Sequence, residues 1–464
     1  MTSRVGQGRR TAWVAGALAA VLSAVLAAGC ASTEAPPKPG GTASPSSSTE
    51  SVTFAVYGPK TVTDAYADVA AAYNADHPTT RVSVKRYATH DEALRGLRAA
   101  QDAGDPPDVF LMDHDDLAAL SEDKMLRRVD DLLAERRVDF GDGFSRGGLE
   151  AFSADAALQC MPWDVSPLVV YYNPALIDLD ALSEQVGHTV SPGRGWTLDE
   201  FAQAALQARR PGVRGLYVAP ELQQVAPFVW SGGGEIVDDE DDPTRLTLAD
   251  GSSLGALEKL LVVVRDPALT FGPVALRRES ALDRFKAGKL GMILGFRDLT
   301  PELRDEPGLT FDVMPLPRIS SGATIATMSG LCLSKDSDRT GAAADFLAAL
   351  ISKTGSSMLA ETGYVMPANL DVLNSDTFLQ PTKNPPSAAV FTREVRDTRL
   401  LPSTPRGPVV RRAVARELTQ LFYQPAILPS LQERLQAIDE ASVPLFDPTK
   451  TFSPSASPSP TPGG

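Results

Sequence analysis

One five-residue stretch has the spacing of a catalytic serine. Residues 143–147 read G-F-S-R-G and match the Gly-x-Ser-x-Gly pattern, in which the serine sits on a sharp turn after a buried strand. The chemistry would be acyl transfer, with a histidine as the base. However, residues 138–142 contain two acids and a glycine in place of an apolar strand, and His188 is the only histidine that follows. This context argues against a serine hydrolase.

A second set of motifs is similar, in order, to the serine, tyrosine and lysine motifs of penicillin-binding enzymes: residues 121–124 (S-E-D-K), 171–173 (Y-Y-N) and 353–355 (K-T-G). The serine motif must open a buried helix, but Ser121 begins an acidic stretch. The lysine motif must lie on a strand, but Lys353 lies between two helical patterns.

The acidic run at residues 238–242 lacks the spaced oxygens and the glycine of a calcium loop. We therefore expect no enzyme, no cofactor and no metal ion.

The remaining candidate residues are arranged around an apolar stretch at residues 158–173. Pro162 and Pro167 each remove a backbone donor, so one uninterrupted strand is not expected here. Two short strands joined by an extended crossing would accommodate both prolines. We expect the chain to leave one lobe and enter a second lobe at this stretch, with Trp163 and Asp164 at the junction.

The residues before this crossing predict an α/β unit. Strands are expected at residues 51–57, 81–87 and 108–112, with helices between them, and Thr89 and Glu92 form a capping box for the second helix. This alternation favours a parallel sheet with helices on its faces. Ligands bind outside the carboxyl ends of such strands. That rule points to Tyr57 and Gly58 after the first strand and to Asp113 and His114 after the third. The alternatives are a rim aromatic packed on its own lobe for Tyr57 and a solvated loop histidine for His114.

The residues after the crossing predict a second α/β unit. Thr197 and Glu200 form another capping box, and further strands are expected at residues 215–219, 290–296 and 330–334. Extended breaks are expected at 311–317 and 366–369. Helices are expected at 254–265, 281–288, 342–351, 355–361, 409–422 and 428–438. Because 464 residues are too many for one simple core, two domains are expected.

The two ends of the chain are predicted to lie outside these domains. Residues 1–30 have a basic head, a short apolar core and a final L-A-A-G-C, as a secretory signal does. Residues 31–50 are rich in Pro, Ser and Thr and predict a flexible tether. Residues 446–464 predict a disordered Ser/Pro tail. The net charge of −14 disfavours a nucleic-acid partner.

Residues 26–30 resemble the lipobox of bacterial lipoproteins. The resemblance implies a lipid on Cys30 that anchors the protein to the extracytoplasmic face of the cell membrane. A permanent transmembrane anchor is the alternative. Export leaves Cys160 and Cys332 in an oxidising compartment, where they form either one bridge or two separate buried thiols.

Six short motifs then occur in the order of one family. They lie at residues 107–110 (P-D-V-F), 161–173, 196–201 (W-T-L-D-E-F), 232–234 (G-G-G), 285–292 (F-K-A-G-K-L-G-M) and 314–317 (M-P-L-P). Over residues 52–444 the chain resembles the extracellular solute-binding proteins of ABC importers, sugar-binding class, typified by maltose-binding protein. The resemblance implies a type II periplasmic-binding-protein fold, with two α/β lobes joined by hinge crossings. Lobe I would comprise residues 51–161 plus 317–364, and lobe II residues 164–312 plus 366–445.

The resemblance also implies a function and a set of partners. The protein would be a monomer that captures a small solute, a carbohydrate or a glycosyl or phosphorylated derivative, by hinge closure and delivers it to an ABC permease. A sensing or scaffold role without uptake is the alternative. The family places the strand around Cys332 beside the strand around Cys160, which makes a bridge plausible.

The ligand-binding candidates combine aromatic side chains, which cover the faces of sugar rings, with charged side chains, which bind hydroxyl groups. Core packing is the alternative for Trp163 and Trp230. Arg297, if it faces the cleft, would suit a carboxylate or phosphate, and a surface salt bridge is its alternative. The candidates are Tyr57, Asp113, Trp163, Asp164, Trp230, Phe296, Arg297 and Tyr364.

Overall fold

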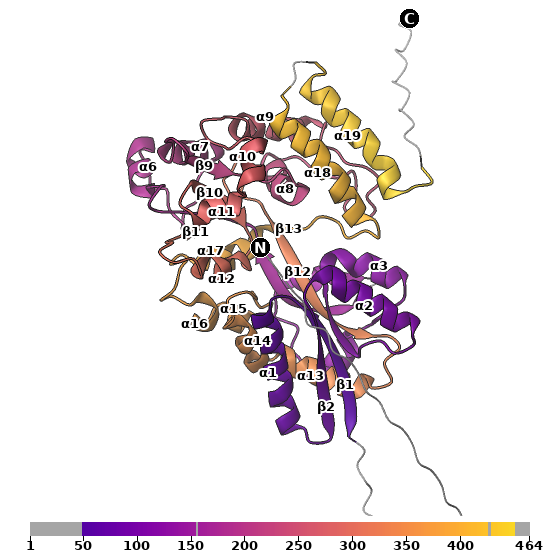
Figure 1. The fold of residues 1–464 in the computed structure, drawn as a ribbon. Helices are drawn as coiled ribbons and strands as arrows, with labels where there is room; N and C mark the ends of the chain where they lie inside the picture. The colour runs from indigo at the N-terminus through magenta and orange to yellow at the C-terminus, as the bar shows by residue number, and fades with distance from the viewer. Residues whose placement is uncertain (1–48, 155, 426–427, 451–464) are drawn as a thin grey trace, which may run out of the picture. The chain divides into compact units, whose positions relative to one another are not determined.

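The computed structural model describes residues 49–154, 156–425 and 428–450. The predicted signal, the lipidation site at Cys30, nearly all of the predicted tether and the tail beyond residue 450 lie outside the described residues. The described residues belong to one compact unit, which contains two main sheets (Figure 1).

The first sheet begins with the predicted parallel strands. β1 (Glu50–Tyr57) lies between β2 (Thr80–Tyr87) and β3 (Val109–Asp113) and is parallel to both. The chain moves from β1 to β2 on one side and then back past β1 to β3. Because such crossovers are right-handed, their helices α1 (Lys60–Asp76) and α2 (His90–Asp102) cover opposite faces of the sheet (Figure 1).

A long strand, β12, completes the first sheet. β12 (Thr324–Ser334) is antiparallel to β3 and to β7 (Cys160–Pro167), and it is parallel to the short β13 (Thr398–Arg399). The sheet order is β13-β12-β3-β1-β2, and β4 (Leu126–Arg127) also pairs with β12.

The second sheet has the order β11-β8-β10-β9. β8 (Val169–Tyr172) is antiparallel to β10 (Leu290–Gly295) and to β11 (Asp312–Met314), and β10 is parallel to β9 (Arg214–Tyr217). Successive side chains of a strand point to opposite faces, so β8 contributes to two apolar clusters. Val170 and Tyr172 belong to one cluster, and Val169 and Tyr171 to the other.

Helices flank both sheets. They include α7 (Leu198–Gln207), α8 (Leu222–Ser231), α9 (Gly251–Val264), α12 (Leu299–Arg304), α13 (Thr340–Ile351), α14 (Lys353–Ala360), α18 (Gly407–Tyr423) and α19 (Leu431–Phe446). Shorter helices are α3 (Leu117–Glu122), α4 (Asp130–Glu135), α5 (Arg146–Ala151), α6 (Leu179–Val186), α10 (Pro273–Arg278), α11 (Ala281–Lys286), α15 (Leu370–Leu373), α16 (Asp376–Leu379) and α17 (Ala389–Glu394). A small ribbon pairs β5 (Ser153–Ala154) with β6 (Ala157–Leu158).

The predicted crossing between the sheets exists, but it lies later than expected. β7 belongs to the first sheet and β8 to the second, and only Leu168 separates them. Trp163 and Asp164, which were expected at the junction, lie inside β7. Pro162, which was not expected inside a strand, lies there too.

A bulge explains how β7 accommodates Pro162. Asp164 pairs with Ser329 of β12, and Pro162 pairs with the next residue, Gly330, so Trp163 is the extra residue on its strand. A bulge interrupts the regular ladder, and proline is tolerated beside such interruptions. Further along the same pair of strands, Cys160 lies opposite Cys332, and a disulfide joins them.

The two enzyme-like motifs lie in the wrong structural contexts for catalysis. Ser145 caps α5, and its hydroxyl accepts a hydrogen bond from the Gly148 N–H. Ser121 lies near the end of α3 instead of opening a helix, and Lys353 begins α14 instead of lying on a strand. These placements agree with the rejection of both motifs.

Candidate functional site

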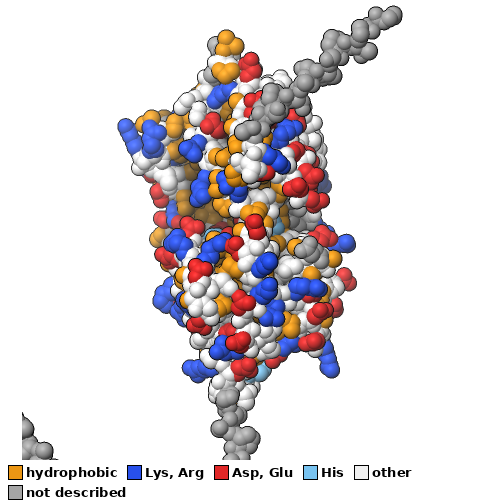
Figure 2. Space-filling view, turned by 90° about the vertical axis from the view of Figure 1, so that its right-hand side faces the viewer, with side chains coloured by type: hydrophobic (Ala, Val, Ile, Leu, Met, Phe, Trp, Pro, Cys, Tyr) orange, Lys and Arg blue, Asp and Glu red, His pale blue; other side chains and the backbone are white. Residues whose placement is uncertain are grey.

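A cavity of about 610 Å³ lies at the carboxyl ends of β1 and β3. Its walls also come from β7, from β12 and from the second-sheet side of the molecule. The space-filling view shows a hollow between the upper and lower parts of the described chain (Figure 2). The lining residues used below are Tyr57, Tyr66, Asp113, His114, Trp163, Asp164, Asp298, Glu302, Asp305 and Tyr364.

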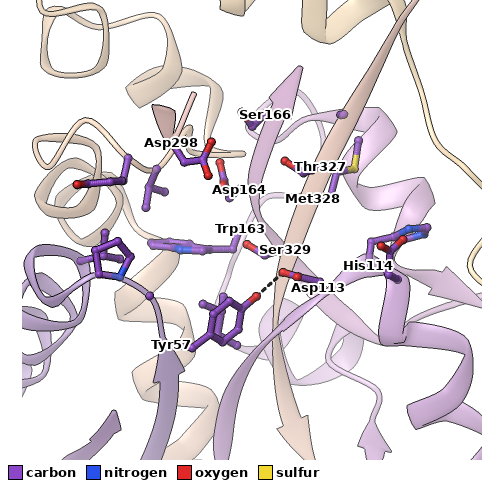
Figure 3. A pocket seen from close by; sticks show the side chains of 18 of the residues that line it. Tyr57, Asp113, His114, Trp163, Asp164, Ser166, Asp298, Thr327, Met328 and Ser329 are labelled. Atoms are coloured by element: carbon purple, nitrogen blue, oxygen red, sulfur yellow. Dashed lines mark hydrogen bonds between the residues drawn. The ribbon is translucent and has the colours of Figure 1, made fainter. Parts of the chain in front are cut away.

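The cavity brings together five of the eight candidate residues. Tyr57, Asp113, Trp163, Asp164 and Tyr364 all line it. Figure 3 shows the first four around one space, although they come from three different strands.

A hydrogen-bonded network holds the carboxylate of Asp113. The Tyr57 hydroxyl donates to Asp113 Oδ1 (Figure 3). His90, at the start of α2, lies behind this pair, with its Nε2 2.5 Å from Asp116 Oδ2 and 3.7 Å from Asp113 Oδ2. The hydrogen bond with Asp116 raises the pKa of His90 to about 9. A protonated His90 therefore supports Asp113 from outside the cavity.

Asp113 is the acceptor that this network presents to a ligand. Burial raises its pKa to about 6, against the opposing effects of the His90 charge and of the Tyr57 hydrogen bond. Asp113 is therefore mostly ionised at neutral pH. Burial, followed by the charge of Asp113, raises the pKa of Tyr57, so its hydroxyl stays protonated and acts as a donor.

Trp163 forms part of an aromatic wall with Tyr66. The Trp163 Nε1–H donates to the Tyr66 hydroxyl at 2.6 Å, and the ring centroids are 6.1 Å apart. Trp163 is only 2% exposed. It therefore serves both the core of the first sheet and the edge of the cavity.

Asp164 follows Trp163 and is only partly exposed. Its Oδ1 accepts a hydrogen bond from the Met366 N–H at 2.8 Å. Residues near Met366 also pair with β7, through a bridge between Asp164 and Pro367. Burial is the main cause that raises the pKa of Asp164 to about 8; the hydrogen bond from Met366 opposes this shift, and the charges of Asp298 and Asp113 act in the same direction as burial. Asp164 is therefore mostly protonated at neutral pH when the cavity is empty.

The structure places Arg297 outside the cavity, contrary to its candidate role. Its side chain is fully buried and donates to the Gly363 carbonyl at 3.1 Å and to the Phe378 carbonyl at 3.2 Å. Its guanidinium also lies 4.6 Å from the Phe378 ring centroid and 5.2 Å from that of Phe391. The side chain points toward α16 and α17 and fixes the segment next to Tyr364. It is neither a cleft cation nor a surface salt bridge.

Trp230 and Phe296 also lie away from the lining. Trp230 is buried on α8, and the Arg399 guanidinium lies 4.7 Å from its ring centroid. Arg399 in turn pairs with Glu235 at 2.6 Å. The Phe296 side chain packs against the second-sheet cluster, and its carbonyl accepts a hydrogen bond from the Tyr171 hydroxyl at 2.7 Å. Both residues have structural contacts that account for them.

Sequence reasoning missed several lining residues. Asp298, Glu302 and Asp305 follow β10, on and around α12. The rule that ligands lie beyond the carboxyl ends of strands could have indicated Asp298, three residues after β10 ends. No local pattern indicates Tyr66 as a lining residue, because it recurs with Val69, Ala70 and Tyr73 at the spacing of an ordinary helix.

The described residues contain no group of three or more His, Cys, Asp or Glu side chains that could hold a metal ion. Within the same part of the chain, no helix has the length and apolar character needed to cross a membrane.

Comparison with known proteins places this geometry in a family. Residues 68–386 match the family model described as bacterial extracellular solute-binding protein. No curated protein matches the chain in sequence.

Solved structures of similar fold cover most of this chain. The ABC substrate-binding protein Lmo0181 from Listeria monocytogenes, in complex with cycloalternan, has a TM-score of 0.69 at 19% identity, over 85% of this chain and 98% of that one. The GacH receptor of Streptomyces glaucescens has a TM-score of 0.68 at 17% identity, over 86% and 98%. The maltose-binding protein MalE from Listeria monocytogenes has a TM-score of 0.68 at 18% identity, over 85% and 98%. These similarities confirm the predicted two-lobe α/β fold.

Proposed function

The chain belongs to the bacterial extracellular solute-binding proteins, and from this premise we propose that it captures a sugar or sugar derivative and delivers it to an ABC permease. It is a binding protein and not an enzyme, as its family indicates. The solved proteins of similar fold include complexes with cycloalternan and maltose, which supports a carbohydrate as the ligand class.

The cavity is the observation that carries this proposal. Its volume of about 610 Å³ is in the range of small-molecule sites. Aromatic side chains and carboxylates share its walls, as sugar recognition requires. In this proposal Tyr57, Trp163 and Tyr364 contact ring faces, and Asp113 and Asp164 bind hydroxyl groups or their equivalents.

Hinge closure is the proposed mechanism. The chain passes between the two sheets at Leu168 and again between Met314 and Thr324. Short connections of this kind can absorb the dihedral changes of a hinge. The ligand would favour the closed state only to the extent that it binds that state more tightly. Asp164 on β7 of the first sheet and Asp298 beyond β10 of the second sheet would approach the same ligand from the two sides of the hinge.

Ligand-dependent thermal unfolding tests the function. We would use protein spanning residues 32–464, which contains all of the residues that the structure describes, with neutral sugars, amino sugars, sugar phosphates, polyols and amino acids. A ligand at about 100 times its dissociation constant should add roughly 2.7 kcal/mol to the free energy of unfolding. Stabilisation by sugars supports the proposal. Stabilisation by amino acids alone, or by no compound, contradicts it.

We also propose that the protein acts as a monomer anchored by a lipid on Cys30 at the extracytoplasmic face of the cell membrane. The sequence at residues 26–30 supports the anchor. Metabolic labelling with palmitate should mark the wild-type protein and not Cys30→Ser. Equal labelling of both would contradict the anchor without affecting the proposed ligand.

A further inference from the structure

The charged side chains that line the cavity are carboxylates, and no lysine or arginine of the described chain lines it. The carboxylates are Asp113, Asp115, Asp164, Asp298, Glu302 and Asp305. Three of them have cationic partners outside the lining: Asp113 lies 3.7 Å from His90, Asp115 pairs with Arg411 at 2.7 Å, and Glu302 pairs with Lys286 at 2.5 Å. Ligand groups that enter the cavity therefore meet negative charge.

Asp164 and Asp298 reach this wall from the two different sheets. Asp164 lies on β7, and Asp298 lies between β10 and α12. Figure 3 shows the two carboxylates pointing toward each other at the top of the cavity. Neither carboxylate is in an ion pair among the described residues, in contrast to Asp115 and Glu302.

The other groups around Asp164 do not supply the missing cation. Asp113 adds like charge, the Tyr66 hydroxyl is already bound to Trp163, and the Met366 N–H is a neutral donor. Arg297 is near enough to influence Asp164, but its guanidinium donates to the carbonyls of Gly363 and Phe378, and Arg297 does not line the cavity. Within the described part of the chain, the space between the two carboxylates therefore lacks a positive group.

We propose that the ligand is a hydroxyl-rich molecule with a cationic amine, as in an amino sugar, and that its ammonium group lies between Asp164 and Asp298. This inference rests on the function proposed above and specifies its ligand class. An ammonium group has three donors and no acceptor, so it serves two carboxylates at once. A neutral sugar provides no positive partner for either carboxyl group, and a sugar phosphate adds negative charge to a lining that is already acidic.

The aromatic lining fits the same ligand. A hydroxyl-rich ring needs an apolar face, and the rings of Tyr57, Tyr66, Trp163 and Tyr364 line the cavity. A cation near an aromatic face is also attracted by the ring quadrupole. Asp113, Asp115 and Asp164 are partly buried, and Asp298, Glu302 and Asp305 are exposed, but all six line the same cavity as these aromatic rings.

Binding of such a ligand should release a proton. In the empty cavity Asp164 is mostly protonated at pH 7, because burial raises its pKa to about 8. An adjacent ammonium group favours the ionised carboxylate. The protonated carboxyl of Asp164 then becomes a carboxylate paired with the ammonium, and its proton passes to the buffer. A neutral ligand at the same place leaves the proton on Asp164.

Calorimetry with matched ligands tests the proposal. The probes are glucosamine and its dimer chitobiose. Each is compared with its N-acetylated form, which has the same ring and no charge. Maltose is the neutral reference, and glucose 6-phosphate is the anionic reference. Each titration is performed at pH 7 in phosphate and in Tris, because their different ionisation enthalpies reveal proton release. We expect an amine to bind at least tenfold more tightly than its acetylated form and to release up to one proton.

Two variants locate the amine. Asp298→Asn should bring the ratio of amine to acetylated affinity close to one. Glu258→Gln, on the exposed face of α9 and outside the cavity, removes one carboxylate elsewhere and should preserve the ratio. Equal or tighter binding of neutral sugars overturns the amine inference and leaves the proposed function intact. A preference for glucose 6-phosphate also overturns it. Failure of all the probes to bind overturns both proposals.

Discussion

Replacing His90 with glutamine should destabilise the protein by an amount that depends on pH. In the folded protein the hydrogen bond with Asp116 raises the pKa of His90 from 6.5 to about 9. Because the folded-state pKa is the higher one, the stabilisation is complete below pH 6.5 and is lost as the pH rises through 9. A glutamine side chain at this position would keep a donor for Asp116 but would carry no charge and would not titrate.

The size of the effect follows from the pKa difference. Each pKa unit corresponds to about 1.4 kcal/mol, so the shift represents about 3 kcal/mol in full. The His90 side chain is 31% exposed, and solvent screening weakens such interactions. We therefore expect His90→Gln to lower the free energy of unfolding by about 2 kcal/mol at pH 6, by about 1 kcal/mol at pH 7.5, and by little above pH 9.5.

Urea unfolding of the wild-type protein and of His90→Gln, at about pH 6, 7.5 and 9.5, measures the difference in their free energies of unfolding. Asp116→Asn is the matched variant, because it removes the partner that contributes most to the shift of His90. In a double-mutant cycle, His90→Gln should then cost much less in the Asp116→Asn background than in the wild type. A loss of stability that stays constant from pH 6 to pH 9.5 would refute the assignment of a charged His90 behind Asp113.

Three further predictions concern the core and the cavity. Replacing both Cys160 and Cys332 with Ser should lower the free energy of unfolding in urea by roughly 2–5 kcal/mol, because the bridge closes a loop with a sequence separation of 172 residues; an unchanged midpoint would show that the bridge is absent in solution. Trp163→Phe should cost roughly 1–3 kcal/mol of stability, because it leaves the buried Tyr66 hydroxyl without its donor. The same variant should weaken sugar binding, whereas Trp230→Phe should leave the affinity unchanged. An equal loss of affinity in both variants would contradict the placement of the cavity. Ligand affinity should fall as the pH drops below about 6, because Asp113 becomes protonated and loses its value as a charged acceptor; an affinity that is constant between pH 7 and pH 5 would exclude this role of its carboxylate.

Local sequence patterns predicted the elements that build the cavity. The alternation and β-branching at residues 51–57 and the apolar run after two prolines at residues 108–112 correspond to β1 and β3. Because ligands lie beyond the carboxyl ends of parallel strands, Tyr57 and Asp113 could be placed together without knowing the fold. The capping box of Thr197 and Glu200 could likewise be predicted from the sequence, because its hydrogen bonds form within one helical turn.

Other features depended on strands that are distant in the sequence. The bulge at Trp163 exists because Ser329 and Gly330 of β12 pair with Asp164 and Pro162, and no local pattern around Pro162 reveals that register. The direction of Arg297 was equally hidden. The Arg297 side chain follows a buried strand and could point either into the cavity or away from it. It points toward the carbonyls of Gly363 and Phe378, which belong to a later segment of the chain.

The sequence by itself determined the family resemblance, the α/β class, the place of the first crossing to within a few residues, and the two strand ends that carry Tyr57 and Asp113. These depend on periodicity, turn residues and caps, which act over a few neighbouring residues. Only the tertiary structure decided that Asp164 and Asp298 face each other, that Arg297 and Trp230 lie outside the cavity, and that its charged lining is acidic. The physical reason is that the charge and shape of a cavity are set by side chains from separate segments, whose distances are fixed by strand register and packing.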